Sequence, residues 1–264
     1  MRKYETWNDV PETTIEKKEL TVDNHGQMIW GKVWLPLNGE EKHPLIIVSH
    51  GLGANYLSLS KYAKILAGHG FACYLFNFRG GGGSRSEGDP MQMSLLTEVS
   101  DIRAIIEAAK SWDFVDPQWI VLMGESQGGA ASGLAAAAES EKINGLILLY
   151  PALMIADNAR AMFPDRNAIP ERFPLFFVEV GRKYAEDVYD LDLSGEIAKY
   201  KGHTLLMHGD VDPVIPLRYA VKLSEMLEDV EFHVIKGGSH GFEPQREEVL
   251  GHILDYLQDT RNLL

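Results

Sequence analysis

The chain has 264 residues, of which 45% are hydrophobic and 24% are charged, and its formal net charge at pH 7 is −13. This composition excludes a disordered or low-complexity chain, and the acidic balance argues against a nucleic-acid-binding surface, which needs clustered lysine and arginine. The sequence holds a single cysteine, Cys73, and therefore neither an intrachain disulfide nor a multi-cysteine zinc site.

Three further features bear on location. The sequence has no run of 18 consecutive apolar residues, so we expect no transmembrane helix. The N-terminal stretch Met1–Asp9 is polar and lacks an apolar run before a small-residue cleavage site, so we expect no secretory signal. Cys73 lies inside an apolar run, which fits a reducing compartment. We therefore predict a cytoplasmic protein that binds neither membranes nor nucleic acid.

The chain opens with a predicted hairpin. Residues 14–22 alternate weakly between polar and apolar, and residues 28–36 form the returning strand. The turn residues Asp23-Asn24-His25-Gly26 lie between them. We expect this antiparallel hairpin at one edge of a sheet.

From residue 45 onwards, short apolar strands alternate with helices. A continuous apolar run such as Leu45–Val48 is typical of a strand that is covered on both faces. The predicted strands are residues 45–48, 71–76, 119–123, 143–150, 203–208 and 231–235. The predicted helices are residues 57–70, 95–112, 126–139, 216–228 and 247–258. Repeated strand–helix units of this kind build a parallel sheet with helices on both faces.

One segment, residues 151–200, interrupts this alternation. It contains four prolines and no clear strand, and its one helical patch lies near Tyr184–Tyr189. A long insertion at the end of a strand in a compact domain is usually functional. We therefore predict a single domain over residues 1–264, with a cap or lid at about residues 151–200.

The clearest chemical signal is the G-x-S-x-G pattern at Gly124–Gly128. It follows a predicted strand and opens a predicted helix, which is the context that a nucleophilic serine on a tight turn requires. The glycines avoid side-chain clashes with the backbone, and the helix N-terminus directs free amides at developing negative charge. The alternative is a glycine-rich turn with an incidental serine. The strand–turn–helix placement favours Ser126 as a nucleophile.

A serine hydroxyl needs a base, and the base needs an orienting acid. His240 lies between small residues on the loop that follows the predicted strand 231–235, and we predict that it is the base. The loop after strand 203–208 offers Asp210 and Asp212 as the acid. We prefer Asp212, because Asp210 directly follows Gly209 and is better placed to stabilise the turn. His208 is a weaker candidate base, since it ends a strand.

The second part of an oxyanion-binding site is expected on the loop after strand 45–48. Its sequence, Ser49-His50-Gly51-Leu52-Gly53, lets the backbone turn so that the Leu52 amide points into the site. The Gln127 amide would be the other donor; the alternative is a simple glycine turn. No zinc-binding H-E-x-x-H or phosphate-binding G-x-x-x-x-G-K-[ST] motif occurs in the sequence, so we expect neither a metal nor a cofactor.

Together these residues resemble the α/β-hydrolase fold over nearly the whole chain. The chain is most similar to the small bacterial cinnamoyl (feruloyl) esterases and their carboxylesterase relatives. The matching pieces are His50-Gly51, Phe78-Arg79-Gly80, Gly124–Gly129, His208-Gly209 with Asp212, and Gly238-x-His240. The resemblance implies a mostly parallel sheet of about eight strands, and the chain order Ser126, Asp212, His240 is that of this fold.

The insertion also resembles that family, through the run Ile169–Pro174 ahead of Tyr184. In relatives, a tyrosine at the position of Tyr184 holds the phenolic end of a hydroxycinnamoyl group. An aspartate early in the cap does similar work, and Asp157 is its approximate match. The resemblance thus implies Tyr184 and Asp157 as substrate-binding residues.

We predict a serine carboxylesterase that cleaves small esters through an acyl-enzyme, with hydroxycinnamoyl esters as the substrates that the resemblance implies. The alternatives on the same fold are a monoacylglycerol lipase-like activity, a thioesterase and a peptidase. The complete triad argues against the remaining hypothesis, a non-catalytic binding protein. The expected partner is a small-molecule ester. The sequence does not decide between a monomer and a homodimer.

Overall fold

The computed structural model describes residues 10–81, 83 and 85–262. The stretch Met1–Asp9, from which we expect no secretory signal, lies outside these residues. No helix in the part of the chain that the structure describes is both long and apolar enough to cross a membrane.

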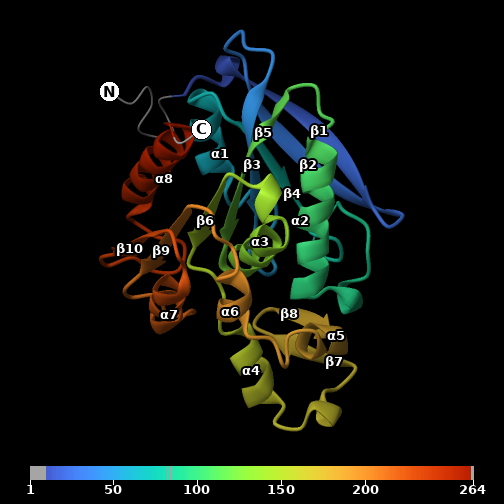
Figure 1. The fold of residues 1–264 in the computed structure, drawn as a ribbon. Coiled ribbons are helices and arrows are strands. Elements are labelled where there is room, and N and C mark those ends of the chain that lie inside the picture. Colours follow the sequence, from blue (N-terminus) through green and yellow to red (C-terminus); the bar gives the residue numbers. More distant parts are fainter. Residues whose placement is uncertain (1–9, 82, 84, 263–264) are drawn as a thin grey trace.

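An eight-stranded sheet forms the centre of the molecule (Figure 1). Its strands, in spatial order, are β1 (Ile15–Asn24), β2 (Gln27–Pro36), β4 (Ala72–Phe76), β3 (His43–Ser49), β5 (Val115–Glu125), β6 (Gly145–Leu149), β9 (Thr204–Gly209) and β10 (Val230–Ile235). The β1–β2 hairpin is antiparallel and lies at one edge, and all pairs from β4 to β10 are parallel. The predicted eight-stranded, mostly parallel sheet is confirmed.

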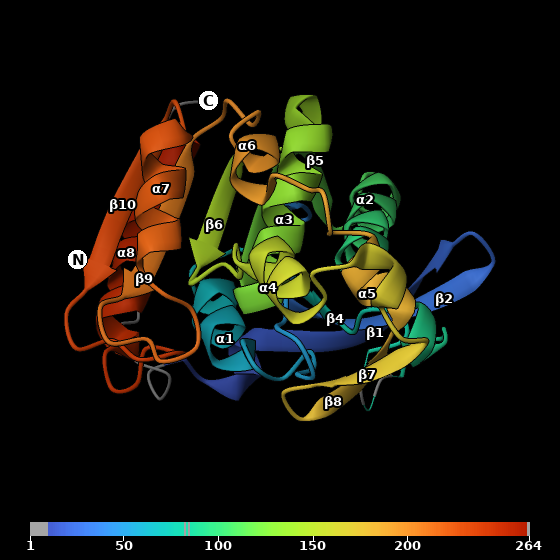
Figure 2. The same ribbon diagram turned by 90° about the horizontal axis from the view of Figure 1, so that it is seen from below.

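Helices cover both faces of this sheet, as Figure 2 shows. On one face lie α2 (Leu95–Ala109), α3 (Ser126–Ala138) and α7 (Arg218–Met226), and on the other lie α1 (Ser60–Gly68) and α8 (Arg246–Asn262). The strands β3, β4 and β6 are buried at every position, because apolar residues face both layers. Every strand and helix predicted outside the insertion is found, with shifts of a few residues at the ends.

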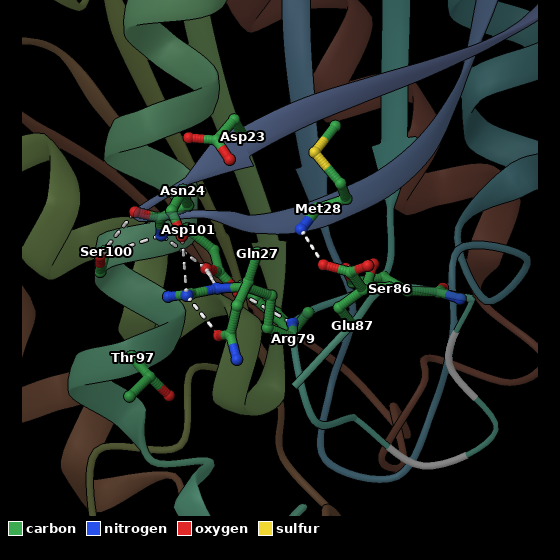
Figure 3. A network of polar contacts seen from close by, with 12 residues as sticks. Asp23, Asn24, Gln27, Met28, Arg79, Ser86, Glu87, Thr97, Ser100 and Asp101 are labelled. Atoms are coloured by element: carbon green, nitrogen blue, oxygen red, sulfur yellow. Dashed lines mark hydrogen bonds and ion pairs between the residues drawn. The ribbon is translucent and has the colours of Figure 1, made fainter. Parts of the chain in front are cut away.

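An ion pair between Arg79 and the buried Asp101 ties the β1–β2 hairpin to α2 (Figure 3). Arg79, just after β4, donates its backbone amide to Asp101 at 2.9 Å and its guanidinium to the same carboxylate. Its Nη1 also donates to the Gln27 side chain at 2.8 Å, and the Asn24 side chain donates to Asp101 at 2.8 Å. Burial raises the pKa of Asp101, and the Arg79 and Asn24 contacts oppose that rise.

The insertion, residues 151–200, lies across the end of the sheet at which β5 and β6 finish (Figures 1 and 2). Its elements are α4 (Ile155–Met162), β7 (Arg172–Leu175), β8 (Val178–Gly181), α5 (Arg182–Glu186) and α6 (Leu193–Ile197). The expectation of no strand here is wrong, since β7 and β8 form an antiparallel hairpin. Each strand has only four residues, and β7 contains Pro174. Neither sequence therefore shows the alternation of polar and apolar residues that predicts a strand.

Candidate active site

Ser126 lies on a strained turn between β5 and α3. Its φ is +52°, a left-handed conformation that costs free energy for a residue with a side chain. A Cβ on Gly124 would lie 2.3 Å from the Gly128 carbonyl oxygen, and one on Gly128 would lie 2.3 Å from the His50 carbonyl oxygen. Both glycines of the pattern are therefore required by close backbone contacts around the serine.

His240 and Asp212 form a hydrogen-bonded pair. His240 Nδ1 lies 2.9 Å from Asp212 Oδ2. The other carboxylate oxygen accepts backbone N–H groups from Val214 at 2.7 Å and from Ile215 at 3.0 Å. The Asp212 side chain is fully buried, while that of His240 is 27% exposed. Because a carboxylate only accepts, the His240 proton lies on Nδ1 and Nε2 is free to act as a base.

The electrostatics of Asp212 suit this role. Burial alone would raise the pKa of its carboxyl group, but the hydrogen bonds from His240, Ile215 and Val214 outweigh burial and lower the pKa below its ordinary value. Asp212 is therefore ionised at neutral pH and stabilises positive charge on the neighbouring imidazole.

Asp210 and His208, the weaker candidates for acid and base, each contact a loop of the site. Asp210 accepts the Gly237 amide at 2.6 Å, so it joins the loop after β9 to the loop after β10. His208 is fully buried, and its Nε2 donates to the Ile215 carbonyl oxygen at 2.9 Å. Both side chains hold the loops that carry Asp212 and His240.

Tyr150 connects the serine turn to the base, and no sequence pattern points to this role. Its hydroxyl donates to Glu125 Oε2 at 2.6 Å, directly before Ser126 in the chain. Its ring centroid lies 4.6 Å from that of His240 and 4.8 Å from that of Phe242. Tyr150 itself has a positive φ of 38°, as does Phe242 at 61°. Strained backbone and ring packing thus gather around both catalytic candidates.

The loop after β3 passes directly over the serine. A Cβ on Gly51 would lie 3.1 Å from Ser126 Cβ and 3.6 Å from Ser126 Oγ, so only a glycine fits comfortably. Leu52 lines the same cavity as Ser126 and Gln127. Gln127 lies in the first turn of α3, where backbone N–H groups have no acceptor within the helix. Leu52 and Gln127, the predicted amide donors, thus both border the cavity into which Ser126 opens.

Ser126 opens into a cavity between the sheet and the insertion. It is lined by Leu52, Ser126, Gln127, Ala152, Met154, Ile155, Asn158, Ala159, Met162, Phe163, Phe173, Leu175, Phe176, Tyr184, Ala185 and Val214. Most of these side chains are apolar, and none of these described residues carries a charged group. The cavity suits an uncharged, largely apolar group.

The structure separates the two substrate-binding residues that the family resemblance implies. Tyr184 lines the cavity, and its hydroxyl donates to Gln127 Oε1 at 2.5 Å. Asp157 lies instead on the opposite side of α4, over a second, polar cavity, where it accepts from Tyr219 at 2.7 Å and pairs with Arg160. The next residue, Asn158, lines the Ser126 cavity. Successive helix positions point about 100° apart, so one step moves the side chain to the other face.

One group of described residues has the composition of a metal site. Glu231 and His233 on β10 and His252 on α8 bring their ligand atoms within 4.8 Å of one another. The two imidazole rings are stacked, with centroids 3.8 Å apart and planes 27° apart. Stacked rings direct their in-plane lone pairs side by side rather than toward one ion. The group is partly exposed and shares no residue with the serine cavity.

Comparison with known proteins gives the family of this chain. A family model described as serine aminopeptidase, S33, matches residues 40–190. The chain belongs to this family. Its fold is the α/β-hydrolase fold, as the sequence predicted. The structure of Est1E from Butyrivibrio proteoclasticus with bound ferulic acid superposes with a TM-score of 0.83 at 26% sequence identity, covering 92% of this chain and 99% of that chain.

The curated relatives match over only part of their length, and their names describe different activities. The quorum-quenching protein AidA of Acinetobacter baumannii is 30% identical over 159 residues, which is 60% of this chain and 50% of that protein. Acyl-protein thioesterase 1 of Emericella nidulans is 29% identical over 153 residues, which is 56% of this chain and 52% of that protein. The chain thus spans about half the length of these two relatives.

Proposed function

We propose that this protein is a serine carboxylesterase with Ser126 as nucleophile, His240 as base and Asp212 as orienting acid. One observation carries the proposal: the His240–Asp212 pair is anchored at the end of the sheet where the strained Ser126 opens into an apolar cavity. An ester with an uncharged acyl group fits that cavity, with its carbonyl at the serine.

The reaction follows from the positions of these groups. The Ser126 hydroxyl attacks the ester carbonyl and gives its proton to His240 Nε2. The Leu52 and Gln127 amides stabilise the oxyanion, and Asp212 stabilises the imidazolium. His240 then protonates the leaving alcohol, so an acyl-enzyme remains. Water, deprotonated by His240, attacks that acyl group and releases the acid and free Ser126.

The lining of the cavity favours an ester over a peptide with a free N-terminus. An aminopeptidase must bind the ammonium group of its substrate, and a buried cation needs a carboxylate or comparable partner. The described residues that line the cavity include no aspartate or glutamate. We therefore place the substrate of this member of the family among neutral esters.

Within the esters, we propose acyl groups that are aromatic or medium-length, including hydroxycinnamates. Phe163 and Phe173 pack edge to face at 4.9 Å and supply aromatic surface to the cavity. Tyr184 and Asn158 add polar atoms that can meet a phenolic hydroxyl. The ferulic acid bound by Est1E supports this class. A thioesterase is the second candidate, because acyl-protein thioesterase 1 is among the relatives.

A substrate panel with two variants tests the proposal. Ser126→Ala should lower kcat by about 10⁴- to 10⁶-fold, because the members of a triad act as a unit. The control is Ser132→Ala, a fully buried serine further along α3, which should leave kcat unchanged. The panel compares acetate, octanoate and ferulate esters with an acyl thioester, a monoacylglycerol and an amino-acid anilide. Retention of more than about a tenth of the activity in Ser126→Ala would refute the mechanism, and no turnover of any substrate by the wild-type protein would leave a binding role.

A further inference from the structure

The Gln127 side chain is held at both ends by residues outside the catalytic triad. Its Oε1 accepts from the Tyr184 hydroxyl at 2.5 Å, and its Nε2 donates to Glu98 Oε1 at 2.8 Å. Gln127 and Tyr184 are buried, as is Glu98 at 3% exposure. The three side chains form one continuous chain from α5 of the insertion, through the first turn of α3, to α2, and Figure 2 shows α5 lying below the start of α2.

Glu98 has an unusual environment for a carboxyl group. Its Oε2 has no hydrogen-bond partner among the described residues. Burial raises the pKa of Glu98 well above its ordinary value, against the opposing effect of the Gln127 hydrogen bond. For packing alone, an apolar side chain would cost less than a buried polar one. The contact that Glu98 makes with Gln127 is therefore the feature that needs an explanation.

The strained backbone at Ser126 explains why Glu98 contacts Gln127. Ser126 has a positive φ, and such a conformation persists only where the surrounding structure over-determines it. Gln127 is the next residue, and its side chain is fixed at two points. The helix that carries Glu98 is itself anchored, because Ser94 and Thr97 form a capping box and the Ser94 hydroxyl donates to Asp187 of the insertion at 2.5 Å.

We propose that Glu98 is a positioning residue of the oxyanion-binding site: through the Gln127 side chain, it fixes the backbone from which the Gln127 amide meets the oxyanion. The inference rests on the proposed esterase function. It assigns a role in the reaction to a residue on α2 that does not line the cavity. Glu98 acts here as a neutral acceptor, so its charge is not required.

The test measures kcat and KM on p-nitrophenyl acetate, whose acyl group is too short to span the cavity. Glu98→Leu should lower kcat about 10- to 100-fold with little change in KM, because a displaced oxyanion donor costs transition-state stabilisation. Glu98→Gln should stay within about threefold of wild type, because its amide oxygen can accept the same bond. The matched control is Glu107→Leu, which removes an exposed carboxylate, paired with Lys110 and Lys142, from the same helix and should leave kcat unchanged.

A second readout isolates the oxyanion. The inhibition constant of a short trifluoromethyl ketone, which forms a tetrahedral oxyanion with the serine, should rise in Glu98→Leu in parallel with the fall in kcat. Binding of the product acetate should not change. Gln127→Met cuts the chain at its middle and covers the case in which Glu98→Leu does not fold. It should reproduce the loss, and the double variant should add little to it.

Each outcome decides the inference. A Glu98→Leu variant within about twofold of wild-type kcat would overturn it, as would an equal loss in Glu98→Gln or in Glu107→Leu. A failure of the esterase function is seen separately, since Ser126→Ala would then keep its activity. Loss in Ser126→Ala together with full activity in Glu98→Leu refutes only the positioning role.

Discussion

The loops at the end of the sheet and the insertion that lies over them contribute to the site in different ways. Around Ser126, position is set by backbone contacts, such as the 2.3 Å that separates a Cβ on Gly124 from the Gly128 carbonyl oxygen. In the insertion, the cavity wall is made of side chains from α4, β7 and α5. The sheet therefore supplies fixed chemistry, and the insertion supplies a surface that substitution can reshape.

This difference predicts two kinds of variant. A change among the sheet residues should affect all esters alike, because every ester reaches the same serine. A change in the insertion should separate long or aromatic acyl groups from acetate, because acetate does not reach those side chains. The ratio of kcat/KM for a ferulate ester to that for acetate measures which kind a variant is.

The largest expected effect on the sheet region is that of the acid, Asp212. Asp212→Asn should lower kcat by about 10⁴-fold on every ester, because an amide donates to His240 Nδ1 and stabilises the wrong tautomer. Asp210→Asn should cost far less, since Asp210 only accepts the Gly237 amide. Steady-state kinetics of both variants on acetate and ferulate esters check this. The reverse ranking would make Asp210 the acid.

The next prediction concerns stability and Glu98. Burial raises its pKa, so the folded protein keeps a proton that the unfolded chain loses as the pH rises above the ordinary glutamate value of about 4.3. The free energy of unfolding therefore falls with rising pH across that window. Glu98→Gln cannot titrate, so its Tm relative to wild type should increase between about pH 4 and pH 8. A difference that stays constant over that range would show that Glu98 is not buried in the protonated form.

Much of the sheet region could be predicted from the sequence. Buried parallel strands are continuous apolar runs, and G-x-S-x-G after such a run has few structural solutions. The loops after successive parallel strands meet at one edge, so Asp212 and His240 could be paired with Ser126 without a structure. Tyr150 and Glu125 could not be found in this way, because a tyrosine at the end of an apolar strand has no distinguishing pattern.

The position of the insertion could be predicted from the sequence, but its secondary structure and side-chain contacts could not. Its boundaries follow from the loss of strand–helix alternation, but the short β7–β8 hairpin has no periodicity to detect. The choice between Asp157 and Asn158 depends on the rotation of α4, which tertiary packing sets. The Tyr184 hydroxyl was expected to face the substrate, and its bond to Gln127 depends on a contact between residues 57 positions apart.

Tyr184 tests whether the two regions are independent. Tyr184→Phe should lower kcat/KM for a hydroxycinnamate ester by about 0.5–1.5 kcal/mol more than for acetate, which is the net worth of one hydrogen bond. Any loss shared by both esters measures the effect on Gln127, whose Oε1 would lose its donor. Kinetics on the ferulate and the unsubstituted cinnamate ester separate the phenolic contact from ring packing. Equal losses on all three esters would assign Tyr184 to the positioning of Gln127 alone.

The smallest expected effect distinguishes the two faces of α4. Asn158 is exposed and lines the serine cavity, while Asp157 faces the polar cavity beside Tyr219 and Arg160. Asn158→Leu should lower kcat/KM for a ferulate ester by at most about 1 kcal/mol, because a solvated amide gives up little on losing one hydrogen bond. It should leave octanoate hydrolysis equal or faster, since an apolar wall suits an alkyl chain. Asp157→Asn, the matched control one position earlier, should change neither ester. If Asp157→Asn lowered ferulate hydrolysis and Asn158→Leu did not, the aspartate implied by the family resemblance would be the substrate-binding residue, and α4 would have to turn toward the cavity when the ester binds.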